Sequence, residues 1–248
     1  MNILLILAFL FAVGSFLGWG LEVIFRRLVS KKWKNPGYLV GPWLPIYGFS
    51  LCILYLLTLI EPYIHMDNPY IRKLLLFIAM AIAITIIEYA AGIIFIKGMK
   101  IKLWDYSDMW GNFQGIICPL FSFFWLIMSA VYYFLIHPHI LDMLRWLSSN
   151  LTFSFCIGFY FGIMVMDFNY SARTLYHIRK FAEEHQIVVR LEELKENVQD
   201  YKKKQGERFS FMFSFKSRLS AREHLERYIV NPDVKKHIDE LRRHIKKK

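Results

Sequence analysis

Apolar residues along the chain gather into five long stretches, each separated from the next by a short segment with polar and charged residues. Each stretch has about 17 to 23 residues, and a helix of that length, rising about 1.5 Å per residue, crosses a hydrocarbon core of about 30 Å. The pattern therefore predicts an all-α, polytopic membrane protein with about five transmembrane helices. The stretches are residues 3–25, 39–60, 74–96, 114–136 and 151–168.

After residue 168 the sequence becomes charged and soluble in character. Within this part, apolar residues recur at spacings of four and three, which is typical of amphipathic helices that pack on another helix or on a membrane surface. We therefore expect a transmembrane domain over residues 1–168 and a basic helical cytoplasmic tail over residues 169–248. The apolar stripes are Ile187, Leu191, Leu194, Val198 and Tyr201, and then Val234, Ile238, Leu241 and Ile245.

Between these two stripes, four phenylalanines alternate with other residues and are flanked by cations. Such a segment either inserts into an anionic bilayer surface or forms a short strand or loop that packs beneath the helices, and the sequence allows both. The phenylalanines are Phe209, Phe211, Phe213 and Phe215.

The chain has a formal net charge of +11 and 56% hydrophobic residues, with a mean hydropathy of +0.32. In a soluble protein this positive charge would point to nucleic acid. Here, however, the basic residues concentrate in short loops and in the tail, beside the membrane. We therefore expect membrane lipids as partners, with anionic headgroups at the tail, and no nucleic acid.

Basic residues are unevenly distributed among the segments that join the five stretches. The first and third joining segments are rich in lysine and arginine, whereas the second and fourth contain few. Because these residues concentrate in cytoplasmic loops, the pattern predicts a multi-pass cell-membrane protein with its N-terminus outside and its tail in the cytoplasm. The first segment carries Arg26, Arg27, Lys31, Lys32 and Lys34, and the third carries Lys97, Lys100 and Lys102.

The first four stretches form a repeat of two hairpins. In each hairpin the first helix carries a glutamate, Glu22 or Glu88, and a basic loop leads to a returning helix with proline near its start. Both hairpins run in the same direction across the membrane, so we expect a parallel repeat with the fifth helix as an addition. The shared loop and proline positions are Asn35, Gly37, Pro42 and Pro45 in the first hairpin and Asn112, Gly115 and Pro119 in the second.

Glu88 is the clearest candidate for a functional residue. A charged group at the bilayer centre costs at least about 2.5 to 3.5 kcal/mol, and Glu88 has Gly92 rather than a cation one helical turn later. It serves either a site inside the bundle or a structural hydrogen bond between helices. Glu22 has Arg26 at i+4, so a surface ion pair explains it almost as well as a site does.

The returning helices begin at the predicted inner face of the membrane, where their free N–H groups carry a partial positive charge. We therefore expect two half-sites that open to the cytoplasm, each made of an acid and a helix N-terminus. The alternative is that the two acids only cap these helices. Asp105 either completes the polar cavity or caps a short helix, and its neighbours Trp104 and Tyr106 fit the aromatic belt at a membrane interface.

Glycines four residues apart occur in two of the stretches, as Gly14 with Gly18 and as Gly158 with Gly162. In a membrane helix this spacing lets a neighbouring backbone approach closely. The spacing thus allows close helix approach within the bundle, which is a signal of packing and not of chemistry.

Side chains that carry hydrolytic, redox or metal chemistry do not form recognisable sets. Cys52, Cys118 and Cys156 all lie in apolar stretches, as packing residues do, and the eight histidines do not converge. The sequence contains no P-loop, Ser/His/Asp set or dinucleotide fingerprint. We therefore expect no metal, no cofactor and no ATPase domain in this chain, and we lean against an enzyme.

The ordered motifs of the two hairpins resemble the CmpB family of bacterial membrane proteins, which are labelled as ABC transporter permeases and have distant vertebrate transmembrane relatives. The motifs are Glu22, segment 35–48, Glu88 with Gly92, segment 104–107, and Asn112 with Gly115, within roughly residues 10–135. The resemblance implies a polar site of Glu22, Asn35, Glu88, Trp104, Asp105, Tyr106 and Asn112. It implies structural roles for Gly37, Gly41, Pro42, Pro45, Tyr47, Gly48, Gly92 and Gly115.

Three functions are consistent with these residues. The one we favour is a permease-type membrane protein, such as the membrane component of an ABC transporter with a separate ATPase subunit, whose inward-facing acids handle a polar solute or protons. The second is a membrane scaffold or sensor that recruits partners through its basic tail. The third is an intramembrane enzyme that modifies lipid headgroups with Glu22, Glu88 and Asp105 as acids and bases. A homo-oligomer is compatible with all three.

Overall fold

The computed structural model describes residues 2–31, 33–206, 215 and 217–231. Within them, five helical stretches are long and apolar enough to cross a membrane, which confirms the predicted all-α polytopic fold. These stretches are Ile3–Ser30, Pro45–Tyr63, Pro69–Met99, Pro119–Ser149 and Leu151–Glu184.

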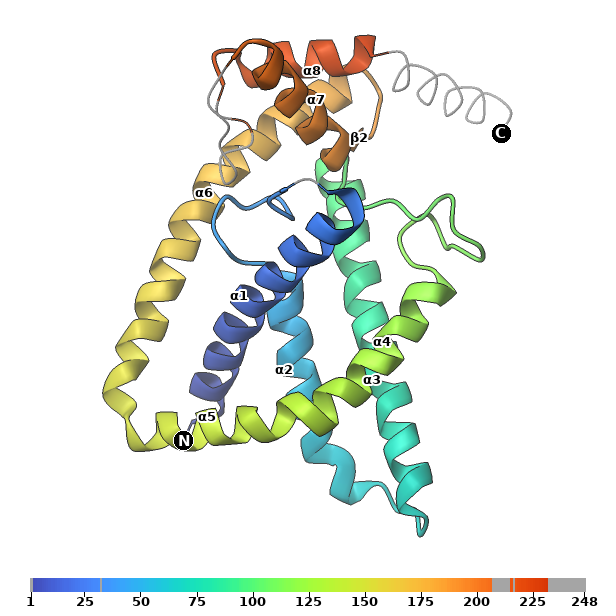
Figure 1. Cartoon of the computed structure of the whole chain (residues 1–248), viewed down its shortest axis with the longest axis vertical. Coiled ribbons are helices and arrows are strands. Elements are labelled where there is room, and N and C mark those ends of the chain that lie inside the picture. The colour runs from blue at the N-terminus through green and yellow to red at the C-terminus, as the bar shows by residue number, and fades with distance from the viewer. Residues whose placement is uncertain (1, 32, 207–214, 216, 232–248) are drawn as a thin grey trace.

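Two antiparallel hairpins form the centre of the molecule (Figure 1). The first consists of α1 (Ile3–Ser30) and α2 (Pro45–Ile60), which ends in the short 3-10 turn η1 (Glu61–Tyr63). The second consists of α3 (Pro69–Ile93) and α4 (Pro119–Val131). Buried side chains from both hairpins meet in one apolar core, which includes Leu10, Leu54, Leu76, Met80 and Tyr132.

The returning helices α2 and α4 begin at Pro45 and Pro119, later than the apolar pattern predicts. The residues before these prolines, Leu44 and Cys118, have extended backbone, because the proline ring disfavours helical geometry in the residue that precedes it. Proline is well suited to the first helical position, where no N–H is needed. Residues 39–44 and 114–118 are therefore apolar loops, and the predicted starts at 39 and 114 are wrong.

The helical stretch that begins with α4 continues beyond its predicted end at residue 136, as far as Ser149. A π-helical turn, η3 (Tyr132–Ile136), leads into α5 (His137–Ser149), which lies across the end of the molecule opposite the tail (Figure 1). A 3-10 turn, η4 (Leu151–Phe153), then starts α6 (Ser154–Glu184), which runs along one side back to the tail. Helix α6 passes the expected domain boundary after residue 168 without a break.

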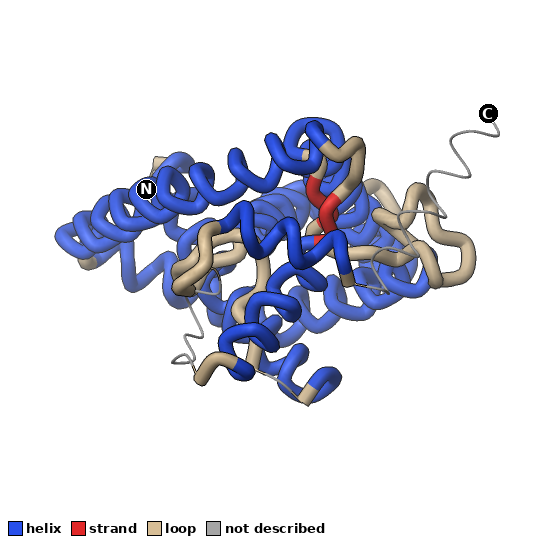
Figure 2. Tube along the Cα trace, turned by 90° about the horizontal axis from the view of Figure 1, so that it is seen from above, coloured by secondary structure: helices blue, strands red, loops and turns tan. Residues whose placement is uncertain are grey.

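The tail packs on the end of the hairpins through a second apolar core. Helix α3 continues as the π-helical turn η2 (Ile94–Met99) into strand β1 (Ile101–Lys102), which pairs in parallel with β2 (Val189–Arg190). Figure 2 shows this strand pair in red among the helices of the tail end. After β2 come α7 (Leu191–Lys204) and α8 (Ala221–Val230).

The predicted stripe that begins at Ile187 is confirmed as an apolar packing surface. Leu191, Leu194 and Val198 are buried on α7, and the first two belong to a core with Leu175 and Leu225 from α6 and α8. Phe215 packs against the same core. The rest of the phenylalanine segment and the second stripe, at Phe209, Phe211, Phe213, Val234, Ile238, Leu241 and Ile245, lie outside the described residues.

Glycines four apart behave differently in α1 and α6. A Cβ atom added at Gly14 would lie 2.9 Å from the Cβ of Leu51, and one added at Gly18 would lie 2.3 Å from the Cβ of Tyr47, so α1 and α2 are in close contact, as the spacing allows. A Cβ added at Gly158 or Gly162 meets no described atom within 4 Å, so no described helix approaches α6 closely there. The spacing permits close packing but does not supply a partner helix.

Candidate functional site

Both membrane glutamates line one cavity between the two hairpins. The cavity has a volume of about 320 Å³, and the loops that precede α2 and α4 contribute to its lining. Volumes of this size are typical of sites for small molecules. The structure thus brings Glu22 and Glu88 to a common space, where the repeat had suggested two separate half-sites.

Glu22 is paired with a cation of its own helix, Arg26. Its Oε1 accepts a hydrogen bond from Arg26 Nε at 2.9 Å, and its Oε2 accepts one from the hydroxyl of Tyr47 at 3.0 Å. Arg26 also donates through Nη1 to Oε2 of Glu192 in α7, at 2.5 Å. Glu22 thus forms the i+4 ion pair that the sequence indicates, and it also lines the cavity.

Glu88 is held by neutral groups only. Its side chain is buried, with 4% of the residue exposed. Oε1 accepts a hydrogen bond from the Tyr106 hydroxyl at 3.1 Å, and Oε2 accepts one from Trp125 Nε1 at 3.0 Å. No described residue forms an ion pair with this carboxylate. An ionised carboxylate has acceptor sites for about four hydrogen bonds, so Glu88 keeps capacity for a ligand.

Two further predicted residues, Trp104 and Tyr106, also line the cavity. Trp104 Nε1 donates to the carbonyl of Ile116 at 2.9 Å, which fixes the ring. Burial and the nearby charge of Glu88 raise the pKa of Tyr106 well above its usual range, so its hydroxyl stays protonated and remains a donor. Burial and Asp167 likewise raise the pKa of Tyr38, another lining residue, to about 12.

Asn35 and Asn112 do not line the cavity but hold the two loops beside it. Asn35 is buried, accepts from Trp19 Nε1 at 2.7 Å and donates to two backbone carbonyls of its own loop. Asn112 likewise donates to two backbone carbonyls of its own loop, and it accepts from the Gly115 N–H at 3.0 Å instead of from a side chain. The two asparagines thus have matching bracing roles, in agreement with the repeat.

Asp105 also lies outside the cavity lining and joins the second loop to the tail. It accepts from Lys102 Nζ at 2.7 Å and forms an ion pair with Arg190 of β2 at 2.9 Å. Burial works against its charge, but the hydrogen bonds from Lys102 and Ser107 outweigh burial, so the pKa of Asp105 is lowered. Asp105 therefore stays charged and fixes the tail to the loop.

The motif glycines and prolines shape the loops and contacts around the cavity. Gly37 and Gly115 have positive φ, at 71° and 66°, which glycine adopts without strain. An added Cβ at Gly48 would lie 2.3 Å from Ser15 Oγ, and one at Gly92 would lie 2.3 Å from Ile116 Cγ2. The Gly41 N–H donates to Asp167, and Pro45 and Tyr47 begin α2 on the cavity wall.

Sequence reasoning missed Asp167 in α6. Its carboxylate accepts from the N–H groups of Val40 and Gly41, at 3.1 and 2.8 Å, and from Trp43 Nε1 at 2.7 Å. A single acid inside the fifth apolar stretch is itself a signal, because such groups need partners within the protein. By contrast, no feature of the sequence distinguishes Trp125 from the lipid-facing aromatic residues of the same stretch.

Among the residues that the structure describes, no group of three or more metal-binding side chains comes together.

The chain matches the model of a family described as "Putative ABC-transporter type IV" over residues 9–172. This match confirms the resemblance seen in the ordered motifs and extends it through most of α6. No curated protein and no solved structure matches the chain.

Proposed function

Since the chain belongs to the CmpB family of ABC-transporter type IV proteins, we propose that it is a permease-type membrane component whose cavity holds a charged or polar solute during transport. The observation that carries this proposal is that Glu22 and Glu88, from equivalent positions of the two hairpins, line the same cavity. Acids inside membrane helices are costly and commonly mark substrate or ion pathways.

The proposed setting is the bacterial cell membrane, with the N-terminus outside and the tail in the cytoplasm. The basic residues of the first and third loops support this orientation. The cavity lies at the loop end of the hairpins, so it would open toward the cytoplasm. A separate ATPase subunit would then supply energy from the cytoplasmic side, where it would act on the loops that join the helices within each hairpin.

Comparison of transported solutes in the native host tests this proposal. A strain that lacks the protein is complemented with the wild-type chain, with Glu88→Gln, or with Glu61→Gln as a matched control. Glu61 lies at the far end of α2, pairs with Arg72 and Tyr133, and does not line the cavity. We expect the deletion and Glu88→Gln strains to share a changed cellular content of the same solute, measured by mass spectrometry at equal protein levels, and the control to behave as wild type. If no solute differs between the deletion strain and the wild type, the transport function is wrong.

A sensor is the second candidate, and the ion pairs of Arg26 favour it. Arg26 joins Glu22 of the cavity to Glu192 of the tail, so a ligand that displaces Arg26 would change the docking of α7. Loss of the tail, residues 185–248, separates the two functions. A transporter core would keep solute movement without the tail, whereas a sensor would lose its output and move no solute.

A further inference from the structure

The two hairpins differ one helical turn after their glutamates. Arg26 follows Glu22 and provides its cation, whereas Gly92 follows Glu88. No longer side chain fits at Gly92, because an added Cβ would lie 2.3 Å from Ile116 Cγ2. Packing of the second hairpin therefore excludes the cation that the first hairpin carries, and Glu88 faces the cavity without one.

The cavity wall around Glu88 is aromatic and apolar. Eight of the residues that line the cavity are aromatic, and three are charged: two glutamates and one arginine. Arg26 is already shared between Glu22 and Glu192, so the described lining residues leave no free cation for Glu88. Faces of aromatic rings attract cations, most strongly where water is excluded. Carboxylate and ring faces together repel an anion and favour an organic cation.

Building on the proposed transport function, we infer that the cavity binds a monovalent organic ammonium ion, with its charge against Glu88 and its apolar body along the aromatic wall. In this arrangement the ligand cation takes, in the second hairpin, the position that Arg26 takes in the first. The free acceptor sites of the Glu88 oxygens receive the ammonium N–H groups of a protonated amine. For a quaternary ammonium ion, the aromatic rings that line the cavity beside Glu88, those of Trp104, Tyr106 and Trp125, supply the contact instead.

Calorimetric titration of the full chain in detergent tests this inference with three probes of similar size. The probes are benzyltrimethylammonium, the neutral benzyl alcohol and the anion phenylacetate. We expect the ammonium ion to bind at least about tenfold more tightly than the other two. Equal binding of the three probes, or preference for phenylacetate, would overturn the inference.

Two variants assign the binding to Glu88. Glu88→Gln removes the charge and retains a side chain that bonds to Tyr106 and Trp125, and we expect it to abolish the preference for the ammonium ion. Ala91→Arg keeps Glu88 but places a tethered cation at i+3 on the cavity wall, and we expect the same loss. Glu61→Gln is the control and should bind as wild type. A folded variant of either kind that keeps the preference contradicts the assignment.

The outcomes separate this inference from the proposed function. Selective ammonium binding without any solute difference in the host would support the cation site and contradict transport. A transported solute that is neutral or anionic would support transport and overturn the cation site.

Discussion

Arg26 of α1 and Glu192 of α7 form an ion pair across 166 residues of sequence, with Nη1 and Oε2 2.5 Å apart. The same arginine binds Glu22, so one guanidinium joins the cavity to the tail. Lys34 and Glu196 form a second ion pair between the same two regions, and Asp105 with Arg190 links the second hairpin. The tail is therefore attached to both hairpins by ion pairs, from α7 to the first hairpin and from Arg190 of β2 to the second.

Glu192→Gln tests this attachment. The variant loses about 1 kcal/mol of partly exposed ion pairing. We therefore expect its melting temperature to fall, and we expect protease to cut faster in residues 185–190, which precede α7. The control is Glu183→Gln, which removes an ion pair with Arg179 whose side chains are both 46% exposed. Limited proteolysis and thermal unfolding are measured for both. Equal cleavage rates in the two variants would contradict a docking role for Glu192.

Lys195 gives the attachment a dependence on pH. Its Nζ donates to the carbonyl of Asn35 at 2.9 Å and to that of Gly37, and burial lowers its pKa to about 8 from an ordinary value near 10.5. Between these two values the unfolded chain binds more protons than the folded one, so stability from this group rises with pH. Below pH 8 both states are protonated and the contribution is constant.

We therefore expect the melting temperature of the wild type minus that of Lys195→Met to increase from pH 7.5 to pH 9.5. Lys180→Met, which removes an exposed lysine of α6, is the matched control. A difference that stays constant over this range would show that Lys195 does not titrate there.

The membrane spans could be predicted because apolar runs of this length are typical of transmembrane helices. Glu22 and Glu88 could be singled out because a charged group within a span is costly. The starts of α2 and α4 could not, because apolar residues such as Leu39 and Leu44 are buried in loops as readily as in helices. Only the position of Pro45, read as the first helical residue, indicates where the helix begins.

The partners of the acids depend on distances that no local pattern encodes. Tyr47 lies 25 residues from Glu22, and Trp125 lies 37 residues from Glu88. In the tail, Glu192, Lys195 and Glu196 look like the solvated face of an amphipathic helix. They instead meet Arg26 near the end of α1 and the loop that follows this helix. This contact follows from the strand pairing of β1 with β2, which positions α7.

Asp167→Asn tests the carboxylate that holds the loop before α2. The carboxylate accepts from four donors, since the Ser171 hydroxyl also donates to it, and the variant keeps only one acceptor oxygen. We therefore expect a loss of about 1 to 3 kcal/mol of stability and a change in the fluorescence of Trp43, whose Nε1 binds Asp167. Asp142→Asn, in an exposed ion pair with Arg145, is the control. Identical melting temperatures for the two variants would exclude a structural role for Asp167.

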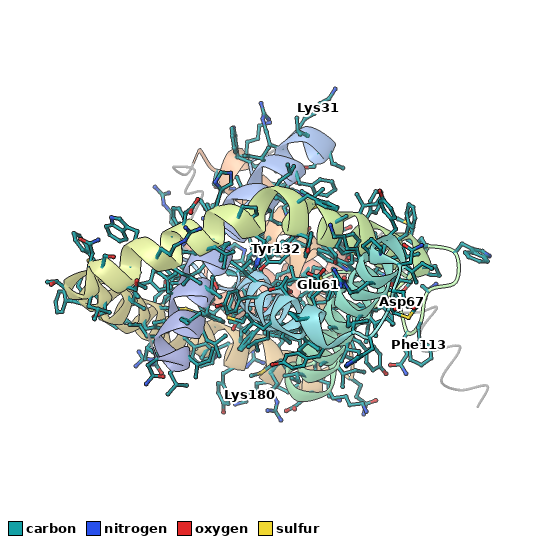
Figure 3. All side chains as sticks on the ribbon, turned by 90° about the horizontal axis from the view of Figure 1, so that it is seen from below. Lys31, Glu61, Asp67, Phe113, Tyr132 and Lys180 are labelled. Atoms are coloured by element: carbon teal, nitrogen blue, oxygen red, sulfur yellow. The ribbon has the colours of Figure 1, made fainter. Side chains whose placement is uncertain are left out.

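Labelling of single cysteines tests the proposed orientation. Lys31 follows α1 at the tail end, and Asp67 lies in the loop before α3 at the opposite end; both are exposed and are labelled in Figure 3. In a chain with its native cysteines replaced, Asp67→Cys should react with an impermeant maleimide in intact cells. Lys31→Cys should react only after permeabilisation. The reverse result would invert the orientation and place the cavity on the outer side.

Gly48 and Gly162 provide the sharpest test of the helix packing, since both are glycines inside apolar helices. An added Cβ at Gly48 meets Ser15 Oγ at 2.3 Å and the Phe11 carbonyl oxygen at 2.7 Å, whereas one at Gly162 meets no described atom within 4 Å. Overpacking of this kind costs about 1 to 3 kcal/mol, and alanine is the better helix former by about 1 kcal/mol where space is free. We therefore expect Gly48→Ala to lower the melting temperature in detergent and Gly162→Ala to leave it unchanged or raise it. If Gly162→Ala were the more damaging, α6 would need a close partner in the membrane, such as a second copy of the chain.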